Sequence, residues 1–191
     1  MARIYFSVDI ETNGLAAGLY SMLSLGVAAI DMETGEITST FKENLEILPD
    51  LMVCPDTMEW WKKFPEAYQR ARENSIPALI VMQDLEHWVT STRSDYHPVS
   101  AAWKPAFDLG FLQYYLHRFL GRSIFGRAGS GLDIKTLAAI ALNQRFSDTQ
   151  IGKVPAWLKG SIETHSHDAL EDAIEQAHVL YNAAKKLGVI L

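Results

Sequence analysis

The chain has 191 residues, of which 48% are hydrophobic, and this is enough to build the apolar core of one domain. We therefore expect residues 1–191 to form a single domain. With 23 acidic and 17 basic residues, the formal net charge is −6 at pH 7. This acidic balance argues against a protein that coats long nucleic acid or tracks along duplex DNA, because those functions usually need a basic face.

The sequence contains no uninterrupted apolar stretch of about 18 residues, so it predicts no membrane-spanning helix and no membrane partner. Asp9 and Glu11 interrupt the apolar run near the start, which argues against a secretory signal. Cys54 is the only cysteine, so the chain cannot form an intramolecular disulfide. A lone cysteine fits a reducing compartment, and we expect a cytoplasmic protein.

The chain begins with three segments whose composition is typical of strands. They cover residues 3–10, 21–32 and 37–47, and a turn at 33–36 joins the last two. This spacing predicts a three-stranded antiparallel meander.

Helices and one further strand are expected next. The pattern predicts a helix at 56–73 that is interrupted near Pro65, and another helix at 77–93. A strand at about 98–102 then precedes a helix at 107–120.

The last third of the chain is expected to be mostly helix and loop. Residues 122–132 are rich in glycine but lack the phosphate-binding G-x-x-x-x-G-K-[ST] pattern, so we interpret them as a flexible loop. A helix at 133–143 and a long loop to about residue 166 precede the final helix. Antiparallel strands followed by alternating helices and strands predict an α/β fold, in which helices cover a mixed sheet.

Two carboxylates lie at the end of the first strand. Asp9 and Glu11 are two residues apart, so their side chains point to the same face of a strand, and Asn13 and Gly14 then provide a turn signal. Neighbouring carboxylates are costly to bury unless positive charge lies between them, and Mg²⁺ and Mn²⁺ prefer oxygen ligands. The pair predicts a metal site, with an ordinary solvated strand end as the alternative.

A third acid, Asp108, lies at the beginning of an apolar run that ends before Gly121. This places Asp108 near a helix N-terminus, where capping and the helix dipole favour a carboxylate. A capping role alone is therefore the alternative to a catalytic role.

The final helix begins with a capping signal. Asp168 is followed three residues later by Glu171, a pattern similar to a capping box, so the helix is expected to begin after Asp168. Asp172 then lies in the first helical turn, while His167 precedes the helix and can reach over a site that Asp172 helps to form. We expect His165 to be a solvated loop residue.

The two histidines raise the alternative of a zinc site like that of metallo-β-lactamase-like hydrolases. That pattern needs an aspartate at position 169 and a histidine at position 170, whereas this chain has Ala169 and Leu170. With one cysteine and no other paired histidines, such a site lacks ligands, and we set it aside.

The motifs D-x-E, F-D and H-x4-D occur in this order between residues 9 and 172. Together they resemble the DEDDh branch of the DnaQ-like 3′–5′ exonucleases. The resemblance implies a ribonuclease H-like mixed five-stranded sheet flanked by helices. It also implies a metal-dependent enzyme that releases nucleoside monophosphates from the 3′ end of single-stranded DNA or RNA. The matching residues are Asp9, Glu11, Asp108, His167 and Asp172.

The resemblance also implies a role for each of these residues. Two divalent cations, Mg²⁺ or Mn²⁺, would lie about 3.5–4 Å apart, with Asp9 bridging them. Glu11 and Asp172 would bind the ion on the side of the nucleophile. Asp108 would hold the second ion, directly or through water, and His167 would be the general base.

Other segments carry weaker likenesses. Relatives contact the terminal nucleotide, often through the backbone, at the positions of Thr12, Asn13, Gly14 and Leu15. For Leu15 the alternative is a structural role at the strand end. Trp60 and Trp61 lie in a segment similar to phage exonuclease A and RNase AS, but a tryptophan pair also suits a core or an oligomer contact. Trp103-Lys104-Pro105 departs from the His-Asn or Gly-Asn of many relatives, so no contact is carried over there.

Two alternatives to this enzyme remain. One is a non-catalytic or regulatory module that binds 3′ ends, although such a module is expected to have lost one or more of the acids. The other is a hydrolase of short phosphodiesters. The sequence leaves open the sugar preference, the physiological substrate, the processivity and the oligomeric state, with a homodimer as one alternative.

Overall fold

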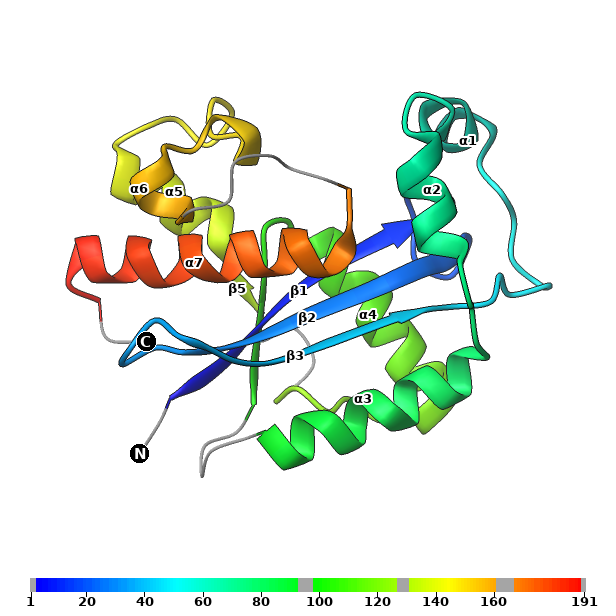
Figure 1. The fold of residues 1–191 in the computed structure, drawn as a ribbon. Coiled ribbons are helices and arrows are strands. Elements are labelled where there is room, and N and C mark those ends of the chain that lie inside the picture. The colour runs from blue at the N-terminus through cyan, green and yellow to red at the C-terminus, as the bar shows by residue number, and fades with distance from the viewer. Residues whose placement is uncertain (1–2, 93–97, 127–130, 161–166, 190–191) are drawn as a thin grey trace.

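The computed structural model describes four stretches of the chain: residues 3–92, 98–126, 131–160 and 167–189. They contain a five-stranded sheet with helices on both faces (Figure 1). Three antiparallel strands make the predicted meander: β1 (Ile4–Thr12), β2 (Met22–Asp31) and β3 (Ile37–Asn44). Two parallel strands extend it: β4 (Val99–Ala102) and β5 (Leu132–Asp133). The order β3-β2-β1-β4-β5 places β1 in the middle and confirms the mixed five-stranded sheet.

The helices form three groups around this sheet (Figure 1). One face is covered by α3 (Ala78–Thr92) and α4 (Pro105–Leu120). The opposite face carries α5 (Ile134–Leu142), α6 (Ala156–Lys159) and α7 (Ala169–Leu187). The third group is the α1–α2 hairpin, which consists of α1 (Pro55–Trp61), the turn at 62–64 and α2 (Pro65–Arg72).

Several predicted boundaries shift, and short elements appear where loops were expected. The predicted break near Pro65 is confirmed, because α1 ends at Trp61 and α2 begins at Pro65. The prediction of one long loop up to residue 166 was wrong, since that segment contains a 3-10 turn, Ile151–Lys153, and α6. Of the loop expected at 122–132, residues 127–130 lie outside the described residues, and residue 132 is already the first residue of β5. Elements of two to four residues are too short to show a hydrophobic period.

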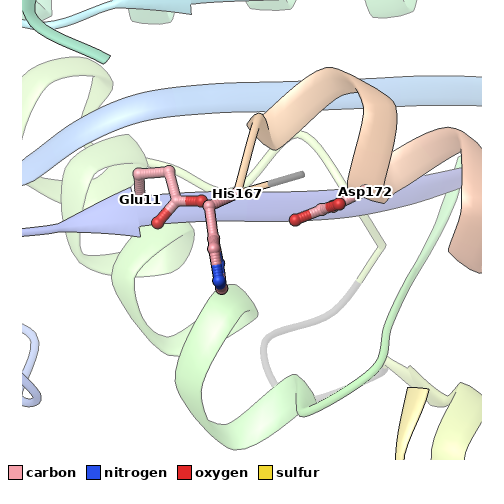
Figure 2. A group of neighbouring side chains, drawn as sticks. All are labelled: Glu11, His167 and Asp172. Atoms are coloured by element: carbon pink, nitrogen blue, oxygen red, sulfur yellow. The ribbon is translucent and has the colours of Figure 1, made fainter. Parts of the chain in front are cut away.

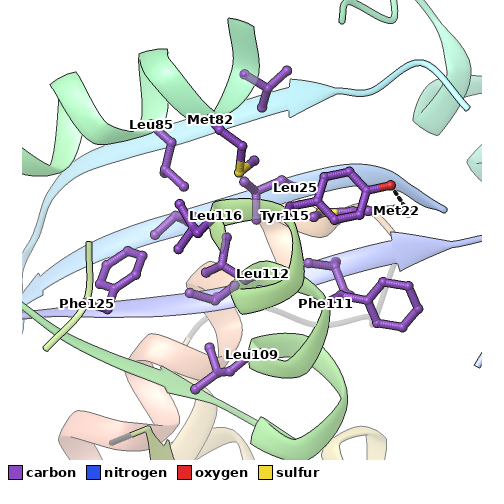
Figure 3. Close-up of a cluster of buried hydrophobic side chains, with 14 of the residues drawn as sticks. Met22, Leu25, Met82, Leu85, Leu109, Phe111, Leu112, Tyr115, Leu116 and Phe125 are labelled. Carbon is purple, nitrogen blue, oxygen red and sulfur yellow. Dashed lines mark hydrogen bonds between the residues drawn. The ribbon is translucent and has the colours of Figure 1, made fainter. Parts of the chain in front are cut away.

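The larger core lies between the sheet and the pair α3 and α4 (Figure 3). Alternate residues of β1, such as Phe6 and Val8, point to this side and are fully buried. Tyr115 of α4 is also buried among them, and its hydroxyl oxygen accepts a 2.9 Å hydrogen bond from the backbone N–H of Met22. This packing fixes the central strand on one side.

The other face of the sheet is covered by α7, which packs through small residues. Ala173 and Ala177 lie on Ala28 of β2, and all three are fully buried. The backbone of α7 comes closest to the sheet at Gly26 of β2. Only glycine fits there, because a Cβ atom would lie 2.2 Å from the carbonyl carbon of Ala169. Glycine at this position therefore lets the first turn of α7 rest directly on the middle of the sheet.

The helices were compared with the length and composition of a membrane-spanning segment. None of those in the described stretches has both the length and the apolar composition that a bilayer crossing requires.

Candidate active site

Asp9 and Glu11 lie on the α7 face of the central strand. They alternate along β1 with Val8 and Ile10, which point to the opposite core. The strand runs to Thr12, two residues beyond its predicted end, so both acids belong to the strand itself. Asp9 pairs across the sheet with Gly26, the residue that admits the first turn of α7. The same glycine therefore brings that turn next to the first carboxylate.

Asp108 reaches the site from α4. The helix begins at Pro105, so Asp108 lies in its first turn, and Lys104 occupies the N-cap position. The side chain is buried, with 5% exposure, and its Oδ2 accepts a 3.3 Å hydrogen bond from the backbone N–H of Lys104. The same carboxylate thus supports the helix start and lines the site.

Asp172 and His167 come from the beginning of α7 and the residue before its cap. The predicted cap is confirmed: Asp168 Oδ1 accepts hydrogen bonds from the backbone N–H groups of Leu170 (3.1 Å) and Glu171 (3.3 Å). Asp172 is buried in the first turn, and His167 lies outside the helix, as predicted. His165 lies outside the described residues.

The five residues predicted from the motifs line one cavity of about 420 Å³. Three of them converge most closely: Glu11, His167 and Asp172 each offer a ligand atom, and these atoms all lie within 4.8 Å of one another (Figure 2). Asp9 and Asp108 complete the set, so one β-strand, one helix start and the beginning of a second helix supply all five.

The carboxylates disfavour one another's charge. Burial raises the pKa of Asp9 well above its ordinary value, and the neighbouring charges of Asp108, Glu11 and Asp172 raise it further. Burial also raises the pKa of Asp108 to about 7. A divalent cation with oxygen ligands would remove this repulsion, so the four acids fit Mg²⁺ or Mn²⁺ better than they fit an apolar or anionic ligand.

Gln176 also lines the cavity, although it belongs to none of the three motifs and was not predicted from the sequence. Its side-chain N–H donates to Asp9 Oδ1 at 2.6 Å, and its Oε1 accepts from the backbone N–H of Trp103 at 2.8 Å. The glutamine therefore fixes the orientation of the Asp9 carboxylate. Its spacing could have indicated this position, because Gln176 lies four residues after Asp172 and therefore shares its helix face.

The turn after β1 separates the four predicted substrate contacts into two kinds. Asn13 and Gly14 shape the turn: Asn13 Oδ1 accepts a 2.7 Å hydrogen bond from the Ser21 N–H, and a Cβ on Gly14 would lie 2.1 Å from the Tyr20 ring. Thr12 and Leu15 instead line a second cavity of about 370 Å³. Leu15 is 73% exposed, so it does not plug the core.

The two tryptophans have different positions. Trp61 is buried, and its indole N–H donates to the carbonyl oxygen of Thr12 at 2.9 Å, which ties the α1–α2 hairpin to the end of β1. Both tryptophans line the second cavity, but only Trp60 has a described ring contact with His167, at a centroid distance of 4.9 Å. Phe107 and Glu11 line both cavities, so the second cavity adjoins the carboxylates.

Solved structures with a similar fold include exonucleases. The nuclease domain of 3′hExo, a DEDDh family member solved with rAMP bound, matches with a TM-score of 0.71 and 12% identity, over 96% of this chain and 92% of that chain. Pop2p of S. pombe, in a form with Mg²⁺ and Mn²⁺ bound, matches with a TM-score of 0.65 and 16% identity, over 95% of this chain and 82% of that chain. The fold is therefore that of the ribonuclease H-like DEDDh exonucleases.

The sequence comparisons define the family more narrowly. The 3′-5′ exoribonuclease Rv2179c-like domain matches residues 5–184. The 3′-5′ DNA exonuclease Cap18 of Escherichia coli is 28% identical over 190 residues, which cover 97% of this chain and 94% of Cap18. The chain belongs to the Rv2179c-like family of 3′–5′ exonucleases, in agreement with the motifs.

Proposed function

We propose that this chain hydrolyses single-stranded DNA or RNA from the 3′ end, releasing nucleoside monophosphates with the help of two divalent cations. One observation carries the proposal: four carboxylates and one imidazole meet in a single cavity of a chain from an exonuclease family. The residues that perform the reaction are Asp9, Glu11, Asp108, His167 and Asp172.

The proposed metal ligands are the four acids. Asp9, on the central strand of the sheet and beside the other carboxylates, would bridge two Mg²⁺ or Mn²⁺ ions, with Glu11 and Asp172 on one ion and Asp108 on the other. When bound, such ions orient water and stabilise the charge of the leaving 3′ oxygen. Gln176 keeps the Asp9 carboxylate in one orientation.

His167 is the proposed general base. Imidazole ordinarily titrates at about pH 6.5, so a neutral ring can accept a proton from the attacking water near neutral pH. Its ring lies beside Glu11 and Asp172 in the cavity, which supports this role (Figure 2).

The second cavity suits the base and sugar of the terminal nucleotide. Its walls include the apolar side chains of Leu15, Trp60 and Phe107, and nucleobases bind to such surfaces by stacking. Because Glu11 and Phe107 line both cavities, a nucleotide held there would present its phosphate to the carboxylates.

Two lysines suit the phosphates upstream of the scissile bond. Lys104 and Lys135 line the first cavity together with polar side chains of the segment 147–150. They provide local positive charge in a chain with a net charge of −6, and this is sufficient if only a few nucleotides are bound.

The sugar preference separates the relatives, because Cap18 is named a DNA exonuclease and the family an exoribonuclease. The test is a side-by-side digestion of matched DNA and RNA oligonucleotides, single-stranded and duplex, with Mg²⁺ or Mn²⁺. Release of mononucleotides from a single-stranded oligonucleotide supports the proposal, and the comparison of the DNA and RNA rates gives the sugar preference. Binding without turnover would instead identify a 3′-end-binding module, and cleavage of only short diesters would identify a different hydrolase.

A further inference from the structure

We propose that the α1–α2 hairpin positions His167 for catalysis by holding its imidazole ring between Trp60 and Phe64. This inference rests on the proposed role of His167 as general base. The ring centroid of His167 lies 4.9 Å from that of Trp60 and 4.5 Å from that of Phe64, with interplanar angles of 87° and 58°. The Trp60 and Phe64 centroids are 4.8 Å apart, so the three rings are in mutual contact. Such contacts favour one ring orientation over others.

The backbone of His167 gives an independent reason why this ring needs support. Its φ angle is +52°, in the left-handed region that residues with side chains seldom adopt. The residue also precedes the Asp168 cap, so it lies outside the helix whose first turn carries Asp172. Strained conformations persist at functional sites when the surrounding contacts hold them, and the two aromatic rings are such contacts.

The same hairpin also reaches the neighbouring residue. Asp168 is 9% exposed, and its Oδ2 accepts a hydrogen bond from Lys42 Nζ of β3 and lies 3.9 Å from Arg70 Nε of α2. Phe64 on the imidazole and Arg70 on the adjacent carboxylate therefore brace two consecutive residues from one element. The hairpin thereby determines where the His167 ring lies relative to the carboxylates.

Phe64 isolates this role better than Trp60 does. Trp60 forms part of the wall of the second cavity, whereas the described linings of the two site cavities do not include Phe64. A change at Phe64 should therefore alter the catalytic step through His167 while leaving the proposed nucleotide-binding walls intact. Because a general base acts only from within hydrogen-bond reach of its proton, a small displacement of the ring lowers the rate.

The test is a double-mutant cycle on a short 5′-labelled single-stranded oligonucleotide. Phe64→Leu keeps an apolar side chain but removes the ring, and we expect it to lower kcat by about three- to tenfold with KM within about twofold. Phe64→Tyr keeps the ring and should restore the rate. In a His167→Ala background, Phe64→Leu should change the residual rate by less than about twofold, because the group it positions is gone.

Tyr68→Leu is the matched control, since Tyr68 belongs to the same hairpin and packs on Trp61 with a centroid distance of 5.5 Å. Its kcat should stay near that of the wild type. An equal loss from Phe64→Leu in both backgrounds would overturn the positioning role while leaving the exonuclease assignment intact. A wild-type protein that digests no oligonucleotide would overturn both. If Phe64→Leu does not fold, Phe64→Met takes its place in the cycle, and the same comparison of backgrounds decides.

Discussion

Asp9 is the residue on which the proposed site most depends. Burial raises the pKa of its carboxyl group, the three neighbouring carboxylates raise that pKa further, and the carboxylate accepts the amide N–H of Gln176. That amide is in turn oriented by the backbone N–H of Trp103. Hydrogen bonds from Trp103 to Gln176 and from Gln176 to Asp9 join the residue after β4 to α7 and β1, so the position of the proposed bridging ligand depends on how these three elements pack.

Replacing Gln176 tests this link. In Gln176→Leu, the Asp9 carboxylate loses its oriented donor and the Trp103 N–H loses its acceptor, so we expect Mn²⁺ affinity or activity to fall by about 10- to 100-fold. Gln113→Leu is the control, because the Gln113 amide donates to Ser123 Oγ outside this site. Equal losses of Mn²⁺ affinity in Gln176→Leu and Gln113→Leu would contradict the proposed role of Gln176 in the site.

His167 and His165 distinguish a general base from a nearby loop residue. We expect His167→Ala to lose at least about a hundredfold in single-turnover rate, because a general base typically contributes that much or more. It should keep the stabilisation by metal, because the four carboxylates remain. His165→Ala should stay within a few-fold of the wild type. The reverse result, with His165→Ala crippled and His167→Ala nearly normal, would mean that the third motif was aligned incorrectly.

Among the elements, α7 and β2 determine whether the site can assemble. The first turn of α7 carries Asp172, and the residue before its cap is His167, so any displacement of this turn moves both. Gly26 is the residue that permits the close approach.

Gly26→Ala should therefore both destabilise the fold and impair catalysis. A Cβ atom 2.2 Å from the Ala169 carbonyl carbon forces the helix start away from the sheet, and overpacking of this kind typically costs about 1–3 kcal/mol of stability. Gly110→Ala is the control, because a Cβ atom there meets nothing within 4 Å. The measurements are the free energy of unfolding in urea and the single-turnover rate; a Gly26→Ala protein as stable and active as the control would contradict this reading.

Local features of the elements could be predicted from the sequence, whereas contacts between elements could not. The shared face of Asp9 and Glu11 and the Asp168 cap were predictable, because they depend on local periodicity and capping, although the predicted strand ended before Glu11. The contact between Gln176 and Asp9 was not, because it joins residues 167 apart in the chain and depends on how α7 packs on the sheet. The same holds for Phe64 and His167, which only the tertiary fold brings together.

At the scale of the whole molecule, charge and metal should determine how stability depends on pH. An unfolded aspartate titrates at about 3.9, whereas folding raises the pKa of Asp108 to about 7 and that of Asp9 well above its ordinary value. The protonated acids favour the folded state, so this contribution is complete below about pH 4 and is lost as the pH rises through about 7.

We therefore expect the metal-free protein to melt at a lower temperature at about pH 8 than at about pH 5, and Mn²⁺ to raise the melting temperature more at the higher pH. In Asp108→Asn, one of these titrations is absent, so the difference between the two pH values should shrink. The measurement is thermal unfolding in EDTA and in Mn²⁺. A difference that is unchanged in Asp108→Asn would show that other groups cause it.

The most direct test of the central claim is digestion of an oligonucleotide labelled at its 5′ end, with Mg²⁺ or Mn²⁺ present. We expect a ladder of progressively shorter labelled products, strong slowing when the 3′ end carries a phosphate, and no ladder with Asp9→Asn. Rapid internal cleavage of a circular single strand, or a ladder of undiminished rate from Asp9→Asn, would contradict a carboxylate-dependent 3′–5′ exonuclease.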